Sequence, residues 1–380
     1  MRTPFLRPMA ALLKDILARL DAAYPFAWAV PEDRVGLQVG HPENPVEVIL
    51  AALEVSEPVV AEAQAKKAQL LLTHHPLLYQ PLGEVREDRG AGRLLAAVLR
   101  AGLALVACHT NLDVAPAGVN DYLARLLKLE EVELLSPVSG DPLHKLAVFV
   151  PVGYEDRVRE ALFDDRVGVI GRYSHCSFAG RGQGTYLPLQ GAQPFRGEVA
   201  SLTRAEESRL EVLVPESRVL AALDRLKASH PYEEVAYDLY PLKNSGSPLG
   251  FGRLGRLSPP LDFTRVVAWV KEVFGVSGVR VWGPAPARVE RVAVLGGSGG
   301  DFISTAREKG AQLYITGEVR HHQVNLGDLK DFAILEVGHF SSEAVFIPEW
   351  VRQLNLLFQE NGLKVQVHGA QTEAPPFACL

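Results

Sequence analysis

Residues 46–75 read VEVILAALEVSEPVVAEAQAKKAQLLLTHH. The apolar start and end of this stretch predict two buried strands, and its middle, rich in Ala, Glu and Lys, predicts a helix. Residues 289–318 read VERVAVLGGSGGDFISTAREKGAQLYITGE and align with the first stretch without a gap. Because a repeated strand-helix-strand unit indicates a repeated architecture, the sequence predicts two related α/β halves far apart along the chain.

The duplication continues into the strand that follows each unit. Residues 103–113, LALVACHTNLD, align with residues 333–343, AILEVGHFSSE. Both copies end in the pattern His-x-x-x-Asp/Glu, which indicates that the strand ends were duplicated together. The matched residues are His109 with His339 and Asp113 with Glu343.

Several side chains with metal-binding chemistry sit where these apolar strands end, and Pro76 stops one strand directly after a His-His pair. Helices on both faces of a parallel or mixed sheet leave the carboxyl ends of the strands as the place for ligands. Three imidazoles and two carboxylates suit divalent ions such as Zn, Fe, Mn or Ni, and they exceed what one tetrahedral zinc needs. We therefore predict two divalent metal ions per chain. The predicted ligands are His74, His75, Asp113, His339 and Glu343.

A His-His pair alone is more often hydrogen-bonded or solvated than bound to metal, so the duplicated framework is what favours the metal site. Adjacent histidines on an extended strand point to opposite faces. Either Pro76 lets both rings turn toward one pocket, or each ring serves a different ion. Metal-bound histidines also need outer partners that fix the tautomer, and the candidates are His109, Glu318 and His322.

The composition limits the class of protein. A chain of 380 residues that is 47% hydrophobic can form two or three cores, so we expect a multidomain protein. The net charge of −6 and pI near 6.0, without a Lys/Arg cluster, argue against nucleic acid as a partner. No apolar stretch approaches membrane-spanning length, and Lys14 and Asp15 interrupt the N-terminal segment before a signal-peptide core. We expect a cytoplasmic location.

The cysteines are Cys108, Cys176 and Cys379, which are widely spaced and odd in number. This spacing fits neither a disulfide framework nor a Cys-x-x-Cys metal site, so we expect reduced thiols. Cys108 ends an apolar strand and is predicted to be buried packing.

Segments at the strand ends carry a family resemblance. In chain order they are DRVGLQVG (33–40), THHPLLYQPL (73–82), HTNLD (109–113), YITGEVRHH (314–322) and GHFSSE (338–343). They resemble the signature segments of the Nif-three-like family (NGG-interacting-factor-three-like proteins), many members of which are labelled type 2 GTP cyclohydrolase I homologues. The resemblance covers roughly residues 8–135 and 248–375, and it departs from the family at Arg34, where an Asn is usual.

The resemblance implies more than the residues alone. It implies that the same five side chains are the ligands of a dinuclear site. It also implies a ring-like homohexamer whose metal sites face an internal cavity. The two halves of the family domain would then be residues 1–137 and 246–380.

The segment between the halves, residues 138–245, has a different order of predicted strands, helices and turns. It predicts strand, helix, Gly-rich hairpin, strand, helix and strand, which is a β-α-β-β-α-β ferredoxin-like plan. This insert is similar to the CutA- or PII-like domain found inside longer Nif-three-like proteins, which suggests a regulatory ligand. Its position between the two halves separately raises the hypothesis of a lid. Its side chains His175, Cys176, His230, Glu233 and Glu234 are not expected to be catalytic; HPYEE (230–234) is expected to end a helix and enter the last strand.

A glycine-rich segment, LGGSGGDF (295–302), follows a strand and precedes a helix. Such a turn can expose backbone N–H groups to an anion. It matches neither phosphate-binding nor dinucleotide-binding motifs cleanly, so close packing is the favoured reason for its glycines. Beside a metal site it is also a candidate for holding a substrate phosphate.

These features favour a metal-assisted hydrolase. Two ions would activate a water, and Glu318 or His322 would relay protons. The family label suggests opening of the GTP ring, while a phosphoester or another nucleotide fits the metals equally well. The alternative is a non-catalytic metal-binding scaffold that senses a small molecule through the insert. In both cases we expect the homo-oligomer that the resemblance implies, a hexamer, without nucleic acid or membrane partners.

Overall fold

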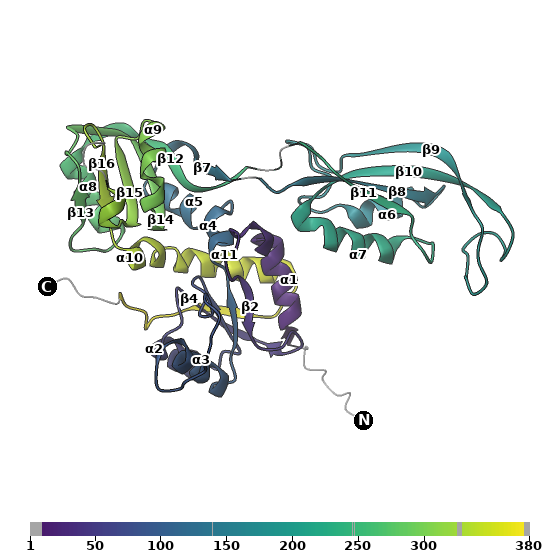
Figure 1. Ribbon diagram of the computed structural model, residues 1–380, viewed down its shortest axis with the longest axis horizontal. Coiled ribbons are helices and arrows are strands. Elements are labelled where there is room, and N and C mark those ends of the chain that lie inside the picture. The colour runs from purple at the N-terminus through teal and green to yellow at the C-terminus, as the bar shows by residue number, and fades with distance from the viewer. Residues whose placement is uncertain (1–9, 139, 245, 247, 325–328, 376–380) are drawn as a thin grey trace, which may run out of the picture. The chain divides into compact units, whose positions relative to one another are not determined.

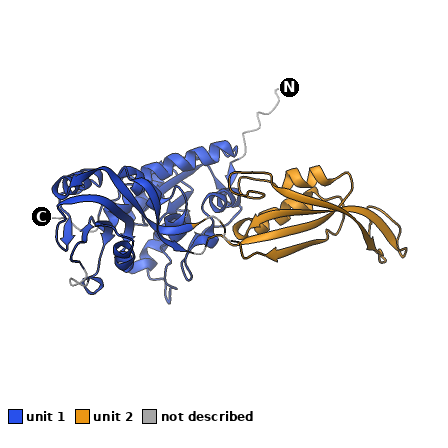
Figure 2. Cartoon of the chain, turned by 90° about the horizontal axis from the view of Figure 1, so that it is seen from above, with its two compact units in different colours: residues 1–138, 249–380 blue, residues 139–248 orange. Residues whose placement is uncertain are grey.

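The computed structural model describes residues 10–138, 140–244, 246, 248–324 and 329–375 (Figure 1). The chain forms two compact units (Figure 2). Unit 1 comprises residues 1–138 and 249–380, and unit 2 comprises residues 139–248, compared with 138–245 expected for the insert. Within the described residues, no helix is long and apolar enough to cross a membrane.

The first half of unit 1 carries a five-stranded sheet in the order β17-β4-β5-β6-β2. Strands β17, β4, β5 and β6 are parallel, and β2 is antiparallel to β6. Along β5 the side chains alternate between two cores: Leu70 and Leu72 face the main core, and Leu71 faces the core under α2 and α3. The bounds are β2 Gly36–Val39, β4 Val48–Ala52, α2 Glu57–Ala65, β5 Leu70–Thr73, α3 Gly90–Arg100, β6 Ala104–Ala107 and β17 Gln366–Gly369.

The second half carries a six-stranded sheet in the order β13-β16-β15-β14-β12-β7. Its central strands β14, β15 and β16 are parallel, as β4, β5 and β6 are, so the duplication seen in the sequence is confirmed. The bounds are β7 Glu130–Val138, β12 Leu249–Asp262, α8 Phe263–Val273, β13 Arg280–Trp282, β14 Arg288–Ser298, η3 Gly300–Phe302, α9 Ile303–Glu308, β15 Leu313–Glu318, η4 His321–Gln323 and β16 Ala333–Glu336.

One glutamine in each half makes the same contact. The side-chain oxygen of Gln69 accepts hydrogen bonds from the backbone N–H groups of Glu47 and Val48, at 2.9 Å each. The side-chain oxygen of Gln312 accepts from Glu290 and Arg291 at 2.8 and 3.0 Å. The duplication therefore extends to side chains that satisfy the start of a central strand.

A single apolar core joins the two halves of unit 1. It contains Ile49 from the first sheet, Val292 from the second, and Trp350 and Phe358 from α11, all at most 1% exposed. After α11 the chain returns to the first sheet as β17, so the second half completes the sheet of the first. The remaining bounds are β1 Ala11–Leu12, α1 Leu13–Ala23, η1 Phe26–Trp28, β3 Pro45–Val46, α4 Thr110–Val114, α5 Val119–Leu126, α10 His339–Ala344 and α11 Ile347–Glu360.

Unit 2 has one antiparallel sheet in the order β11-β8-β10-β9, with its own buried core against two helices. HPYEE ends a helix as expected: α7 stops at Ser229, and His230 donates from Nε2 to the Phe149 carbonyl at 3.1 Å while Nδ1 accepts from the Tyr232 N–H. The bounds are β8 Leu143–Pro151, α6 Glu155–Leu162, β9 Ser177–Tyr186, β10 Thr203–Pro215, η2 Glu216–Arg218, α7 Val219–Ser229 and β11 Tyr237–Pro241.

The cysteines agree with the expected thiols where the structure describes them. Cys108 is buried and Cys176 is partly exposed, and both are free. Burial raises the pKa of the Cys108 thiol to about 12, which keeps it protonated. Cys379 lies outside the described residues.

Candidate metal centre

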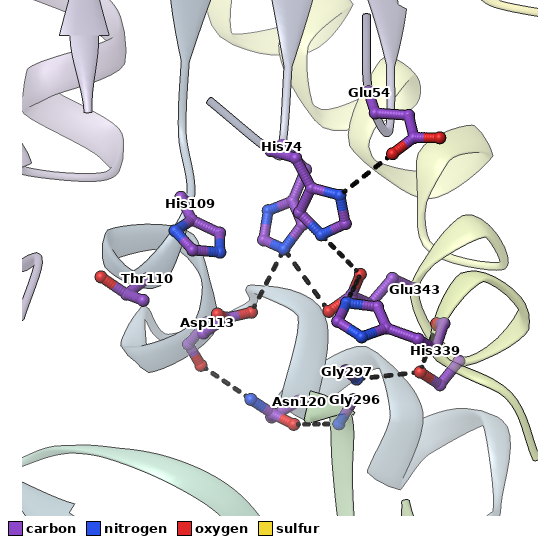
Figure 3. A network of polar contacts seen from close by, with 12 residues as sticks. Glu54, His74, His109, Thr110, Asp113, Asn120, Gly296, Gly297, His339 and Glu343 are labelled. Atoms are coloured by element: carbon purple, nitrogen blue, oxygen red, sulfur yellow. Dashed lines mark hydrogen bonds and ion pairs between the residues drawn. The ribbon is translucent and has the colours of Figure 1, made fainter. Parts of the chain in front are cut away.

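The predicted ligands come together in unit 1, at the carboxyl ends of strands from both halves (Figure 3). His74 and His75 follow β5 directly, and their backbone N–H groups still bond to the carbonyls of Ala52 and Leu53 at 3.1 and 2.8 Å. Asp113 lies on α4. The remaining two ligands lie on α10, which begins where β16 has ended. The parallel sheet order thus gathers residues that are far apart in the sequence.

Glu343 is the centre of the cluster. Its Oε2 lies 3.0 Å from Nε2 of His75 and 3.2 Å from Nε2 of His339, and its Oε1 lies 3.7 Å from Nε2 of His74. Nε2 of His74 is also 3.7 Å from Oδ1 of Asp113. The two rings of the His-His pair lie with centroids 5.0 Å apart and face different oxygens of the same carboxylate. Imidazole nitrogens and carboxylate oxygens at these separations are a donor set that could hold a metal ion.

The outer nitrogen of each of these histidines faces an acceptor. Nδ1 of His74 lies 2.8 Å from the Cys108 carbonyl. Nδ1 of His75 is 3.8 Å from Oε2 of Glu54, and Nδ1 of His339 is 3.6 Å from Oε1 of Glu318. An acceptor at Nδ1 favours the tautomer with its lone pair on Nε2, which points to the centre.

Two atoms at the centre are buried without a hydrogen-bond partner: Nε2 of His74 and Oε2 of Glu343. Their side chains are only 2% and 5% exposed. Buried polar atoms in native proteins are nearly always satisfied, and a divalent cation would satisfy both of these. The described Lys and Arg residues do not offer that charge, because none lies within 4.0 Å of the Asp113 or Glu343 carboxylates. The residues therefore fit a metal.

The charges of the cluster depend strongly on each other. Burial favours the neutral acid of Glu343, but His339, His74 and His75 hold its pKa well below its usual range. Burial raises the pKa of the Asp113 carboxyl. Burial opposes charge on His75, yet Glu343 and Glu54 raise its pKa to about 10. Without a metal, protons on the histidines therefore neutralise the carboxylates.

Of the predicted outer partners, Glu318 lies beside His339, and its side chain is 46% exposed. His322 is exposed on η4, and no contact among the described residues joins it to the cluster. The ring of His109 lies close to the cluster, with centroids 5.3 Å from His74 and 5.7 Å from His75.

Sequence reasoning missed two carboxylates at this site. Glu54 follows β4, so its place at a strand end of the same sheet was a signal that could have found it. Asp33 lies 2.9 Å from Nδ1 of His109 and belongs to DRVGLQVG, a segment to which no role had been given. Nothing in its local pattern indicates a contact 76 residues further along the chain.

The glycine-rich segment packs against the cluster. Its first glycines extend β14 to Ser298, and only the following residues turn into η3. The N–H of Gly296 donates to Oδ1 of Asn120 at 3.1 Å, and that of Gly297 donates to Oγ of Ser342 at 2.9 Å. A Cβ on Gly297 would lie 2.2 Å from Oε1 of Glu343. Close packing therefore explains these glycines, and their two N–H groups are already used.

In unit 2, His175 is exposed and Glu233 accepts from the Gln193 N–H at 2.8 Å. Among the described residues of that unit, no three His, Cys, Asp or Glu side chains form a metal-type group. The two such groups in the described chain are both in unit 1. They are His74 with His75 and His109, and His75 with His339 and Glu343, with ligand atoms within 4.8 Å of one another.

Comparisons with known proteins identify the family. Residues 11–376 match the family described as Duf34/NIF3 (NGG1p interacting factor 3). A Bacillus subtilis protein named "GTP cyclohydrolase 1 type 2 homolog" is 39% identical over 367 residues, covering 97% of this chain and 98% of that one. A Mycobacterium tuberculosis protein of the same name is 36% identical over 339 residues, covering 88% of this chain and 89% of that one. The crystal structure of a Bacillus cereus protein related to NIF3 has a TM-score of 0.85 at 36% identity, covering 98% of this chain and 100% of that one. The chain belongs to the Duf34/NIF3 family.

Proposed function

We propose that the chain binds two divalent metal ions and is a metal-dependent hydrolase acting on a nucleotide or a phosphorylated small molecule. The observation that carries the proposal is the shared carboxylate of Glu343, which faces three histidines and leaves Oε2 buried without a hydrogen-bond partner. His74 and Asp113 would hold one ion, His75 and His339 would hold the other, and Glu343 would contact both. Zn, Fe, Mn and Ni all suit this mixture of imidazole and carboxylate.

When bound, two such ions supply a water that ionises near neutral pH and draw electrons from the group under attack. The protein supplies the rest. The Cys108 carbonyl fixes the tautomer of His74 from outside, and the carboxylates of Glu54 and Glu318 lie on the outer side of His75 and His339. Glu318 is half exposed beside His339, so it can exchange protons with solvent, and it remains our candidate for proton relay. His322 keeps that role only as a prediction.

The relatives' name motivates the first substrate to test. Opening of the GTP ring is a hydrolysis that an activated water would start, and phosphoesters and other nucleotides come next. Because the N–H groups of Gly296 and Gly297 are already bonded, these two glycines are not our candidates for a phosphate site.

Elemental analysis of untagged protein tests the proposal first. We expect about two ions per chain in the wild type and their loss in the double variant His74→Ala, His75→Ala. Each metal-loaded form is then screened for nucleotide hydrolysis. A metal content well below one ion per chain that the double substitution leaves unchanged would refute the metal centre. Protein that binds metal but hydrolyses no nucleotide would refute the enzymatic function.

A second candidate function is a metal-dependent scaffold. It is favoured by one observation: Glu343 from the second half contacts His74 and His75 of the first half, so bound ions would tie the halves together. In this case the Glu343→Ala variant loses metal and melts much earlier, while the wild type turns over no nucleotide.

We also propose that unit 2 is a ferredoxin-like, PII- or CutA-like domain that senses a small ligand. Its strand order β11-β8-β10-β9 and alternating helices support the first part. A ring-like homohexamer is proposed from family resemblance, and light scattering after size-exclusion chromatography tests it. The cytoplasmic location stays a prediction.

A further inference from the structure

The imidazole of His109 is held from behind by a buried carboxylate. The side chain of Asp33 is 1% exposed, and its Oδ1 lies 2.9 Å from Nδ1 of His109. The same carboxylate accepts from the Thr110 N–H at 3.1 Å, the Thr110 hydroxyl at 2.5 Å and the Arg34 N–H at 2.8 Å. Four donors thus fix Asp33, and Asp33 fixes the ring of His109.

This arrangement leaves Nε2 of His109 as its free nitrogen. An ionised carboxylate can only accept, so Nδ1 carries the hydrogen, and in the neutral ring the lone pair is then on Nε2. His109 belongs to a group of three histidines whose ligand nitrogens lie within 4.8 Å of one another, with His74 and His75. Its position and tautomer are those of a metal-binding histidine.

The duplication supplies an independent argument. His109 directly precedes α4 and Asp113 lies within it, as His339 begins α10 and Glu343 lies within that helix, four residues after the histidine in both halves. In the second half, the histidine has Nδ1 toward a carboxylate, that of Glu318, and Nε2 toward the centre. The first half repeats this pattern, with Asp33 in the place of Glu318.

We propose that His109 is a sixth metal-binding residue, that it binds the same ion as His74 and Asp113, and that Asp33 is its positioning residue. The inference rests on the proposed metal centre and adds a ligand and an outer partner to it. Each ion then receives two histidines and at least one carboxylate.

Titration of metal-stripped, full-length protein with Co²⁺ tests the proposal, because both the number of ions bound and the visible spectrum are read. We expect two ions in the wild type. The His109→Ala variant should bind one of them at least 10-fold more weakly, with a changed visible spectrum, and Asp33→Asn should weaken the same ion by about 10- to 100-fold. His368→Ala, which removes an exposed histidine of β17, is the matched control and should behave as the wild type.

A His109→Ala protein that binds both ions with wild-type affinity and spectrum would overturn the inference while leaving the metal centre intact. If His109→Ala does not fold, as judged by circular dichroism, Asp33→Asn keeps the test, since unchanged affinity and spectrum in that variant would also overturn it. A wild type that binds no Co²⁺ would refute the proposed function and the inference together, so the two failures are distinguishable.

Discussion

Glu343 is the residue on which the centre depends most. It faces three histidines, so the variant Glu343→Gln keeps the shape of the side chain and removes the negative charge that the two proposed ions would share. We expect the metal content to fall from about two ions per chain to below one, measured by elemental analysis. Glu360→Gln, at the exposed end of α11, is the control. Two ions retained in Glu343→Gln would contradict the shared carboxylate.

Gly297 allows the carboxylate of Glu343 to approach the backbone. Its φ is +67° and an added Cβ would lie 2.2 Å from Oε1 of Glu343, so Gly297→Ala should displace the carboxylate and lower the metal content. Gly310 has a φ of +78° with nothing within 4 Å of an added Cβ, so Gly310→Ala isolates the backbone cost of a left-handed alanine, about 1–2 kcal/mol. The free energy of unfolding in denaturant and the metal content are measured for both variants. Equal losses of both quantities in Gly297→Ala and Gly310→Ala would show that the close approach of Glu343 to Gly297 does not matter.

His75 makes metal binding sensitive to pH. Its folded pKa is raised to about 10 by Glu343 and Glu54 against the effect of burial, so it is protonated at pH 7 without metal. A metal ion must displace that proton, so the affinity rises with pH up to about 10 and binding releases acid. The number of protons released when Zn²⁺ is added in weak buffer at pH 7 measures this displacement. His368→Ala should release as much acid as the wild type, and His75→Ala less.

Among the elements, the central strands owe part of their stability to the repeated glutamines. Gln69 and Gln312 each accept two backbone hydrogen bonds at the start of a parallel strand. Gln69→Ala and Gln312→Ala should each lower the free energy of unfolding by about 1–3 kcal/mol, and by similar amounts because the contacts are equivalent. Gln359→Ala, exposed on α11, serves as the control in urea unfolding. A large effect in only one half would argue against equivalence.

For the whole chain, bound metal should add to stability because both halves supply ligands. For one ion at 100 times its Kd, mass action contributes about 2.7 kcal/mol to the free energy of unfolding. Removing metal should therefore lower the Tm of unit 1 by roughly 5–10 °C per ion, read by calorimetry with and without chelator. The double variant His74→Ala, His75→Ala should show no chelator effect. An unchanged Tm in the wild type would contradict metal bridging of the halves.

The local pattern of apolar residues and of proline was sufficient to predict the strands and helices of the chain. Apolar runs such as 48–52 and 70–73 predicted buried strands, and their alternation with helices predicted a parallel or mixed sheet, in agreement with the parallel pairs of both sheets. Pro231 marked the end of α7 in the same way. These features follow from side-chain periodicity and backbone restrictions, which act over a few residues.

The sequence by itself determined the duplication, both central sheets and the strand ends that carry His74, His75, Asp113, His339 and Glu343. Tertiary packing was needed to bring α10 against the end of β5, to put Asp33 behind His109, and to occupy the glycine N–H groups. The physical reason is that such contacts join residues far apart in the chain. They depend on how an apolar core orients whole elements, and hydrophobic periodicity does not record which polar side chains then meet.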